Sequence, residues 1–478
     1  MKLLPFIGRR GFLLASAALL AACAQTPRTQ QTQQTPQTPQ TQQTPPAAGR
    51  APIVFVHGNG DTAALWHTTV WRFESNGWPR DRLFAIDHPY PQSRDADDVA
   101  QPGRSSAAEH RAFLAAEVDR VLRATGARQV VLIGNSRGGN AIRNYIANGG
   151  AARVSHAILG GTPNHGVWSD AGFRPTNEFN GAGPFLTALN NQGGSGVEIT
   201  PGVKWMTVRS ADNDKFAQAD GVWIGAKGRP TNVTAASPEL EGALNVVLPG
   251  IDHRETSYGP LAFSAAWRFL TGSEPAHTQP LPETRVVLDG VVSGFGLAND
   301  PARGTAPTNL PLVGATVEVY ATDAHSGERV GAVRWRKTVG ADGRWGPFEA
   351  DGRTPYEFVV SAPGYAVAHI YRSPFPRSSN LVGLRAERPL PEADKAAGSV
   401  LRFARPRGYF GVPRDRLSFD GISPAPGIAP GVAGVADARL RLPPAAPRAV
   451  VAEFNGERIV GRSWPASENR SVVLELHD

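Results

Sequence analysis

The chain has 478 residues, and its 49 lysines and arginines only slightly exceed its 42 aspartates and glutamates. The basic excess is scattered as single arginines, so the sequence does not indicate a nucleic-acid partner. One cysteine excludes a disulfide within the chain, and the length predicts two or three domains.

Residues 1–24 have the pattern of an export signal, in which a basic segment precedes a short run of leucine and alanine. This run is too short to span a membrane as a helix. Residues 9–13, RRGFL, resemble a twin-arginine signal, and residues 20–23, LAAC, resemble a lipobox whose cysteine is acylated. Ordinary signal peptidase cleavage at Ala22-Cys23-Ala24 is the alternative, and it would release a soluble protein that begins at Gln25.

We favour acylation of Cys23, because the only cysteine of the chain stands at the lipobox position. The sequence therefore predicts an exported protein, which is either a membrane-anchored lipoprotein or a protein of the periplasm or the extracellular space. Residues 25–50 are almost all Gln, Thr, Pro and Ala, and they cannot bury enough apolar surface to offset the entropy of ordering. We expect a disordered linker there.

Short apolar runs alternate with helical patterns across residues 51–275. Residues 105–126, for example, have the apolar spacing of an amphipathic helix and lie between two β-rich runs. Continuous apolar strands separated by helices are typical of a parallel sheet that is covered on both faces. The expected strands lie within PIVFVHGNG, QVVLIGNS, SHAILGGTP, KWMTVRSAD and LNVVLPG.

The helical patterning ends near residue 275, and β-rich runs separated by Gly, Pro and Asp turns follow. They predict a β-sandwich module at 283–388 and a further β region at 389–478. The expected fold class is therefore α/β, with a mostly parallel sheet, followed by a C-terminal all-β sandwich region. This β part would either widen the surface that contacts substrate or act as a spacer that stabilises the chain.

Ser136 lies in Gly134-Asn135-Ser136-Arg137-Gly138, which matches the pattern G-x-S-x-G. A buried strand enters this motif and an amphipathic helix leaves it, as in a nucleophile elbow. In such an elbow the serine has a strained backbone, and small neighbours let the strand and the helix approach. The alternative is a plain turn, since the motif also arises by chance in a chain with 52 glycines, but the context favours a nucleophile.

A nucleophilic serine needs donors for the oxyanion that forms during acyl transfer. His57-Gly58-Asn59-Gly60 follows the first strand, and this loop would lie beside the serine. We expect the backbone N–H groups of Asn59 and Arg137 to form the oxyanion hole. His57 would brace the loop rather than act as a base.

The base and its acid are expected at the carboxyl ends of later strands, with the acid first in the chain. Of eleven histidines, His253 stands directly past a late strand of the first domain, so we predict it as the base; a surface turn histidine is the alternative. Asp212 and Asp214 follow the preceding strand. We prefer Asp214 as the acid and keep Asp212 as the alternative, and the aspartate that is not the acid would cap the loop.

The HG loop, the serine elbow, the segment GGTPNHGV and the order Asp then His together resemble the α/β-hydrolase superfamily, in particular its secreted lipases and esterases, over residues 51–272. Residues 214–218 also have the form Asp-x-apolar-apolar-Gln, which is frequent in the acid loop of such lipases. Asn135 and Arg137 depart from the residues that are more common in the elbow. The segment YEFVVSAPGYAVAHIYRSPFPRSSN more weakly resembles the β-domain of prokaryotic two-domain lipases.

The resemblance implies hydrolysis of acyl esters through a Ser-His-Asp triad and an acyl-enzyme, with no metal and no organic cofactor. The sequence thus predicts a secreted serine carboxylic-ester hydrolase, a lipase or esterase whose partners are small-molecule, lipid or polyester substrates. The alternatives are a depolymerase of polyhydroxyalkanoate or other polyester oligomers, an acyltransferase that uses the same triad, and a non-catalytic tethered binding protein.

A connection at about 168–203 contains no core strand, and long connections of this kind often form caps over active sites. Phe185, Leu186 and Leu189 have helical spacing. They would either face the acyl chain or pack a surface helix onto the sheet.

Overall fold

The computed structural model describes residues 49–297 and 304–478. The predicted export signal, Cys23 and all but the last two residues of the predicted linker lie outside the described residues. Within the described ranges, no helix is both long enough and apolar enough to cross a membrane.

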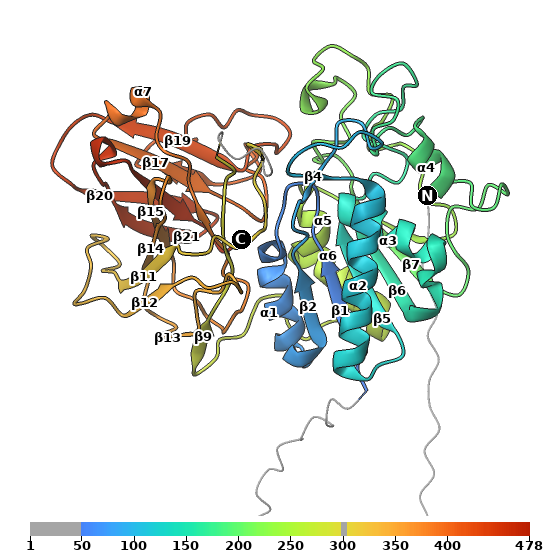
Figure 1. Cartoon of the computed structure of the whole chain (residues 1–478), viewed down its shortest axis with the longest axis horizontal. Coiled ribbons are helices and arrows are strands. Elements are labelled where there is room, and N and C mark those ends of the chain that lie inside the picture. Colours follow the sequence, from blue (N-terminus) through green and yellow to red (C-terminus); the bar gives the residue numbers. More distant parts are fainter. Residues whose placement is uncertain (1–48, 298–303) are drawn as a thin grey trace, which may run out of the picture. The chain divides into compact units, whose positions relative to one another are not determined.

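The first half of the described chain is built on a six-stranded sheet with the order β2-β1-β5-β6-β7-β8, and every pairing in it is parallel (Figure 1). Its central strands are continuous apolar runs because both faces of the sheet are buried. The strands are β1 (Ile53–Val56), β2 (Leu83–Ile86), β5 (Val130–Asn135), β6 (Val154–Gly160), β7 (Lys204–Ser210) and β8 (Leu244–Leu248). A separate short pair consists of β3 (Gln92–Ser93) and β4 (Arg104–Ser105).

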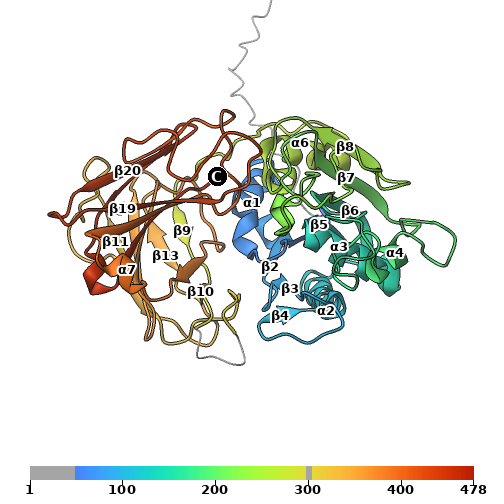
Figure 2. The ribbon, with the colours of Figure 1, turned by 90° about the horizontal axis from the view of Figure 1, so that it is seen from above.

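Helices cover both faces of this sheet. Ile53 and Phe55 of β1 share one apolar core with α1 and α6, whereas Val54 and Val56 share a second core with α2 and α3. Figure 2 shows these two pairs of helices on opposite sides of the sheet. The helices are α1 (His67–Ser75), α2 (Ala107–Thr125), α3 (Arg137–Tyr145), α4 (Pro184–Leu189), α5 (Glu255–Tyr258) and α6 (Pro260–Thr271).

The described residues between 286 and 475 form strands, one short α-helix, α7 (Glu392–Lys395), and a single 3-10 turn at Ala466–Glu468. Seven strands form a sheet with the order β12-β11-β14-β15-β22-β17-β19. Two smaller sheets pair β10 with β16 and β13 with β9, and a third has the order β18-β20-β21. The predicted fold class, a parallel α/β sheet followed by a β-rich C-terminal region, is confirmed. The strands are β9 (Val286–Leu288), β10 (Val292–Gly294), β11 (Thr316–Ala321), β12 (Trp335–Thr338), β13 (Phe348–Ala350), β14 (Tyr356–Ser361), β15 (Val367–Arg372), β16 (Leu384–Ala386), β17 (Ser399–Ala404), β18 (Leu417–Phe419), β19 (Asp437–Leu442), β20 (Ala449–Phe454), β21 (Glu457–Arg462) and β22 (Arg470–Glu475).

One strand links the two parts of the β-rich region. β22 lies between β15 and β17 and pairs with both in parallel. β15 belongs to the module predicted at 283–388, whereas β17 and β22 belong to the region predicted at 389–478. The two parts therefore share a sheet, a link that the sequence does not predict because parallel strands distant in the chain have no turn signal between them.

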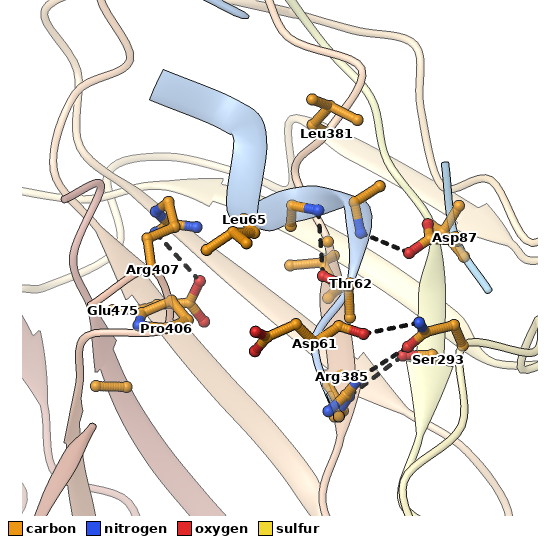
Figure 3. A pocket seen from close by; sticks show the side chains of 18 of the residues that line it. Asp61, Thr62, Leu65, Asp87, Ser293, Leu381, Arg385, Pro406, Arg407 and Glu475 are labelled. Carbon is orange, nitrogen blue, oxygen red and sulfur yellow. Dashed lines mark hydrogen bonds and ion pairs between the residues drawn. The ribbon is translucent and has the colours of Figure 1, made fainter. Parts of the chain in front are cut away.

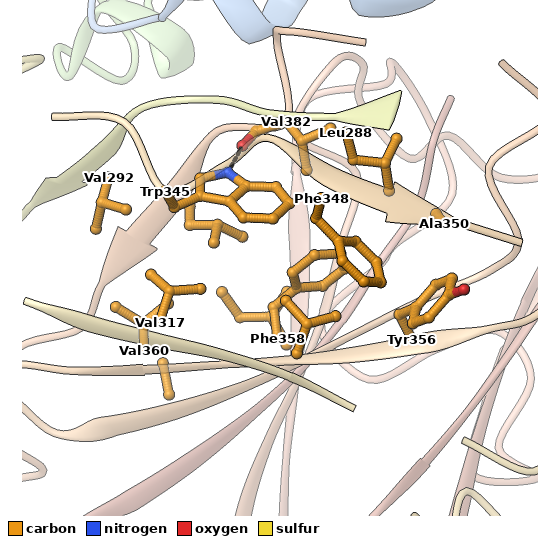
Figure 4. Close-up of a cluster of buried hydrophobic side chains, with 14 of the residues drawn as sticks. Leu288, Val292, Val317, Trp345, Phe348, Ala350, Tyr356, Phe358, Val360 and Val382 are labelled. Carbon is orange, nitrogen blue, oxygen red and sulfur yellow. Dashed lines mark hydrogen bonds between the residues drawn. The ribbon is translucent and has the colours of Figure 1, made fainter. Parts of the chain in front are cut away.

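The seven-stranded sheet carries an apolar core on each face. On one face, Val473 of β22 belongs to the core that contains Trp345 and Phe358, and Figure 4 shows how the labelled aromatic side chains gather in it. On the other face, Val472 and Leu474 belong to a core with β18, β20 and β21. Successive side chains of a strand point to opposite faces, so β22 contributes to both cores.

Candidate active site

Ser136 stands at the sharp turn between β5 and α3. Its backbone has φ 53° and ψ −121°, a conformation that costs free energy in a residue with a side chain. Its N–H donates to the carbonyl oxygen of Gly160 over 2.8 Å, which holds the turn against the end of β6. The residue is only 8% exposed. The structure thus places Ser136 in a strained, well-supported turn at the carboxyl end of the central strand.

Two glycines let the backbone close around this turn. A Cβ atom on Gly138 would lie 2.4 Å from the carbonyl oxygen of Val56, so α3 passes directly against the end of β1. A Cβ atom on Gly58 would lie 3.1 Å from Cβ of Ser136. The loop that contains Asn59 therefore lies beside the serine, as the sequence predicts.

His253 lies in the turn after β8, and Asp214 lies in the turn after β7. Nδ1 of His253 is 2.8 Å from Oδ2 of Asp214, and both residues are buried. The other carboxylate oxygen of Asp214 accepts a hydrogen bond from the Phe216 N–H over 2.8 Å, and the Phe216 ring lies edge-to-face on the imidazole with centroids 4.7 Å apart. A carboxylate oxygen accepts here, so Nδ1 is the donor of this hydrogen bond, and in a neutral imidazole Nε2 is then the acceptor.

The histidine lies close to the serine turn. The side-chain amide of Asn135 donates to the carbonyl oxygen of His253 over 3.3 Å. A Cβ atom on Gly161 would lie 3.1 Å from Nδ1 of His253, and the preceding residue, Gly160, holds the Ser136 N–H. Nε2 of His253 is buried and has no hydrogen-bond partner among the described residues. The site therefore contains a buried imidazole nitrogen next to the elbow that has no partner in the described ranges.

Asp212, the alternative acid, has a different contact. Its Oδ1 accepts a hydrogen bond from the Gly250 N–H over 2.9 Å, which ties the turn after β7 to the turn after β8. Of the two aspartates, Asp214 is the one that contacts His253. Asp212 is in the position of a loop cap.

The two predicted oxyanion donors are the backbone N–H groups of Asn59 and Arg137. Neither has a hydrogen-bond partner within residues 49–297 and 304–478, so both can donate to a ligand. The Asn59 side chain accepts from the Ser93 N–H over 2.8 Å, which fixes its loop. Nε2 of His57 accepts from the His88 N–H over 3.1 Å, so this imidazole braces the same loop.

The Arg137 side chain has a structural contact that the sequence did not predict. Its guanidinium is fully buried, and Nε donates to Glu178 over 2.5 Å. Nη1 donates to Pro91 O and Ser105 Oγ, and Nη2 donates to Ser105 O over 2.7 Å. Burial raises the pKa of Glu178 to about 7. An arginine inside the G-x-S-x-G turn was the only signal in the sequence, and it did not identify these partners.

Two cavities lie near these turns, one lined by Arg254, the residue after His253, and the other by Asp214, and neither is lined by Ser136 or His253. One of about 340 Å³ is lined by Asp61, Arg254 and Arg385 together with residues of the β-rich region (Figure 3). Charges of both signs line it, and Ser136 does not. A smaller one of about 90 Å³ is lined by Asp214 and by residues of the turns after β6 and β7. In the described part of the chain, no group of three or more His, Cys, Asp or Glu residues is arranged to hold a metal ion.

The predicted cap segment at about 168–203 contains α4. Leu186 and Leu189 are buried, and Phe185 is partly exposed. Arg143 of α3 holds the segment through the Leu189 carbonyl oxygen at 3.3 Å and the Asn190 side chain at 2.6 Å. The segment is thus anchored to the helix that follows Ser136.

Two family models match the chain. The model described as Lipase (class 2) matches residues 50–177, and the model described as Lipase C-terminal domain matches residues 284–389. Among curated proteins, a non-heme haloperoxidase from Rhodococcus erythropolis is 33% identical over 111 residues, which are 23% of this chain and 35% of that protein. The chain thus matches about a third of the length of this curated relative.

Several solved structures are similar in part. The mature form of Bacillus licheniformis lipase BlEst2 has a TM-score of 0.34 and 23% identity, over 48% of this chain and 95% of that chain. Aspergillus fumigatus lipase B has a TM-score of 0.34 and 13% identity, over 48% and 55%. Phospholipase PlaB from Legionella pneumophila has a TM-score of 0.31 and 15% identity, over 71% and 94%.

The family matches confirm the predicted resemblance to lipases in both halves of the chain. The match at 50–177 contains the serine elbow, and the match at 284–389 lies in the β-rich region. Both support the predicted enzyme class, a carboxylic ester hydrolase.

Proposed function

We propose that the chain is an exported serine carboxylic ester hydrolase, with Ser136 as nucleophile, His253 as base and Asp214 as the acid that orients it. The observation that carries the proposal is the His253 imidazole. Its Nδ1 lies 2.8 Å from Asp214, and its buried Nε2 has no partner in the described part of the chain, beside a serine in a strained turn. Nucleophile, base and acid in this arrangement activate a hydroxyl group for attack.

In the first half-reaction, Nε2 of His253 takes the proton of Ser136 as its oxygen attacks the ester carbonyl. The C–O bond to the alcohol breaks, His253 returns the proton to the leaving alcohol, and an acyl-serine remains. Asp214 keeps the hydrogen on Nδ1 and stabilises the imidazolium. In the second half-reaction, His253 takes a proton from a water molecule as the water oxygen attacks the acyl carbon. The C–O bond to Ser136 then breaks, His253 returns the proton to the Ser136 oxygen, and the carboxylic acid leaves.

Negative charge develops on the former carbonyl oxygen in both half-reactions. The unpartnered backbone N–H groups of Asn59 and Arg137 are the donors that we assign to it. Loss of one oxyanion donor typically lowers kcat by about 10²–10³-fold, so each of the two N–H groups would contribute strongly to the rate. The substrates that we propose are acyl esters of lipids or small alcohols, and short polyester oligomers are included.

A panel of p-nitrophenyl esters of rising chain length, with a short polyhydroxybutyrate oligomer and Ser136→Ala as the control, tests the proposal. Hydrolysis that requires Ser136 supports it, and the rank order of substrates gives the acyl length. Incubation with an ester and an excess of a simple alcohol distinguishes an acyltransferase from a hydrolase. If the main product is then the transferred ester rather than the acid, the second half-reaction above must be replaced by alcoholysis.

We also propose that the protein is exported and anchored through an acylated Cys23, because the only cysteine of the chain stands in LAAC. Growth with a labelled fatty acid tests this. Label should enter the wild-type protein and be absent from Cys23→Ala. Wild-type protein that carries no label and begins at Gln25 would instead support the released form.

A further inference from the structure

The loops that carry Asp214 and His253 both contact residues 389–478, which we call the C-terminal β region. On the acid loop, the residues on either side of Asp214 make these contacts. The Asn213 side chain accepts from the Ala433 N–H over 2.8 Å, and Nζ of Lys215 donates to the Gly434 carbonyl oxygen over 2.9 Å. The acid is therefore held between two hydrogen bonds to a segment more than 200 residues away.

The base has the same kind of support. Oδ2 of Asp252, the residue before His253, accepts from Nη1 of Arg405 and from the Tyr409 N–H, both over 2.8 Å. The guanidinium of Arg254, the residue after His253, lies 4.6 Å above the Tyr409 ring. Both chain neighbours of the base thus contact the C-terminal β region.

Arg405 is the centre of the contact behind the base. It is 1% exposed, and its Nη2 donates to Glu255 over 2.6 Å and to the Tyr258 hydroxyl over 2.8 Å. The carboxylate of Asp252 is fully buried, and its other oxygen accepts from the N–H groups of Arg254 and Glu255. One oxygen of Asp252 therefore shapes the turn that contains His253, and the other holds this turn to Arg405.

A planar guanidinium that binds two carboxylates fixes direction as well as distance. A buried ion pair adds little net stability compared with apolar side chains of the same volume, because the loss of solvation offsets the attraction between the charges, although removal of one partner alone is destabilising. Its effect on geometry is different, since a displacement of about 1 Å of a catalytic group can cost about 10²-fold in rate. The contact of Arg405 with Asp252 is therefore better suited to orient the turn than to stabilise the protein.

We propose that Arg405 is a positioning residue for the base: through Asp252 it orients the turn that carries His253, so that the C-terminal β region sets the rate of ester hydrolysis. This inference rests on the proposed function. It assigns a role in the reaction to residues beyond both segments that match lipase family models.

The chain offers a matched control at another contact with the β-rich region. Arg377 is also nearly buried, and its Nη2 lies 2.8 Å from Glu283 and 3.4 Å from Glu74 of α1. None of these three residues contacts Asp214, His253 or a chain neighbour of either. Arg377→Met should therefore lower stability without moving the base.

The test compares the full chain with Arg405→Met, Arg405→Lys and Arg377→Met. The measurements are the melting temperature, kcat and KM on a short soluble ester, and the low-field proton resonance of the His253 Nδ1–H, which is assigned by its absence in His253→Ala. We expect Arg405→Met to lower kcat by about 10- to 100-fold, with a much smaller change in KM, and to broaden or remove the resonance. Arg405→Lys should retain part of the kcat and part of the resonance intensity, and Arg377→Met should retain the full wild-type kcat and resonance.

A wild-type kcat and resonance in Arg405→Met would overturn the proposal and leave Arg405 a structural residue. Equal losses of kcat in Arg405→Met and Arg377→Met would also overturn it, because the effect would then be general to the interface. If Arg405→Met does not fold, the kcat and the His253 Nδ1–H resonance of Arg405→Lys test the proposal instead. If the wild-type protein hydrolyses no ester, the proposed function fails, and the resonance alone still shows whether Arg405 positions His253.

Discussion

Oδ2 of Asp214 lies 2.8 Å from Nδ1 of His253, whereas Oδ1 of Asp212, two residues earlier in the same turn, accepts from the Gly250 N–H. The two carboxylates therefore have separate tasks, one on the imidazole and one on the backbone of the next turn. This difference makes the acid of the proposed triad directly testable.

We expect Asp214→Asn to lower kcat by about 10⁴-fold, because an amide at this position can hold the wrong tautomer of His253. Asp212→Asn should leave kcat within a few fold and lower the melting temperature slightly, since it weakens the bond to Gly250. Steady-state kinetics with thermal melts of both variants measure this. The opposite ranking would transfer the role to Asp212.

Ser136→Ala and His253→Ala should each remove nearly all turnover, by about four to six orders of magnitude, because members of a triad act as a unit. The double variant should be hardly worse than either single one. Circular dichroism and melting temperature serve as controls for the fold. Substantial ester hydrolysis by Ser136→Ala would rule out the proposed mechanism as a whole.

At Arg137, the role of the backbone N–H can be tested apart from the role of the side chain. Arg137→Met keeps the N–H that we assign to the oxyanion hole but leaves Glu178 buried without its charge partner. We expect a loss of about 3–5 kcal/mol of unfolding free energy, measured by urea unfolding, with kcat on a soluble ester little changed below the transition. Arg137→Met with Glu178→Met should recover much of this stability. A large fall in kcat at unchanged stability would mean that the guanidinium itself acts in the reaction.

Gly138→Ala tests the close approach of α3 to β1. Its Cβ would lie 2.4 Å from the Val56 carbonyl oxygen, so either the strand end or the helix must shift, and the proposed oxyanion loop lies on that strand end. We expect little soluble protein, or a folded protein with a kcat lowered by at least about 10²-fold. Gly340→Ala is the control, because its Cβ would have an ordinary contact of 3.5 Å with Asp342. Normal expression and kcat in Gly138→Ala would contradict the geometry of the elbow.

The sequence predicted that Ser136 stands at a strand-to-helix turn and that Asp214 and His253 follow later strands, because these placements depend on local patterns. Their roles in a triad stay a prediction. Ser136 stands between a buried strand and a helix, and His253 stands directly after a strand, so each could be placed from its own neighbours. Asp212 and Asp214 could only be ranked, since both follow β7 by a few residues. The direction of each carboxylate depends on the exact path of the turn and on the position of Gly250.

The contacts of Arg405 could not be predicted from the sequence. Arg405 and Asp252 are 153 residues apart, and no periodicity or turn motif connects them. The same is true of Arg137, whose partners lie in three separate segments. The placement of β22 between β15 and β17 also depends on the complete tertiary structure, because its apolar alternation fits any buried strand.

This placement of β22 has a consequence for biosynthesis. The seven-stranded sheet cannot close until residues 470–475 have left the ribosome, although its first strand pair is complete by residue 338. At ordinary elongation rates, the 200 residues from 275 to 475 take about 10 to 40 seconds to translate. Until then β15 and β17 lack the strand that lies between them. Arg405 directly follows β17, so its position is not fixed before the sheet is complete. Newly made chains should therefore gain esterase activity as a late step, well after the α/β half has emerged.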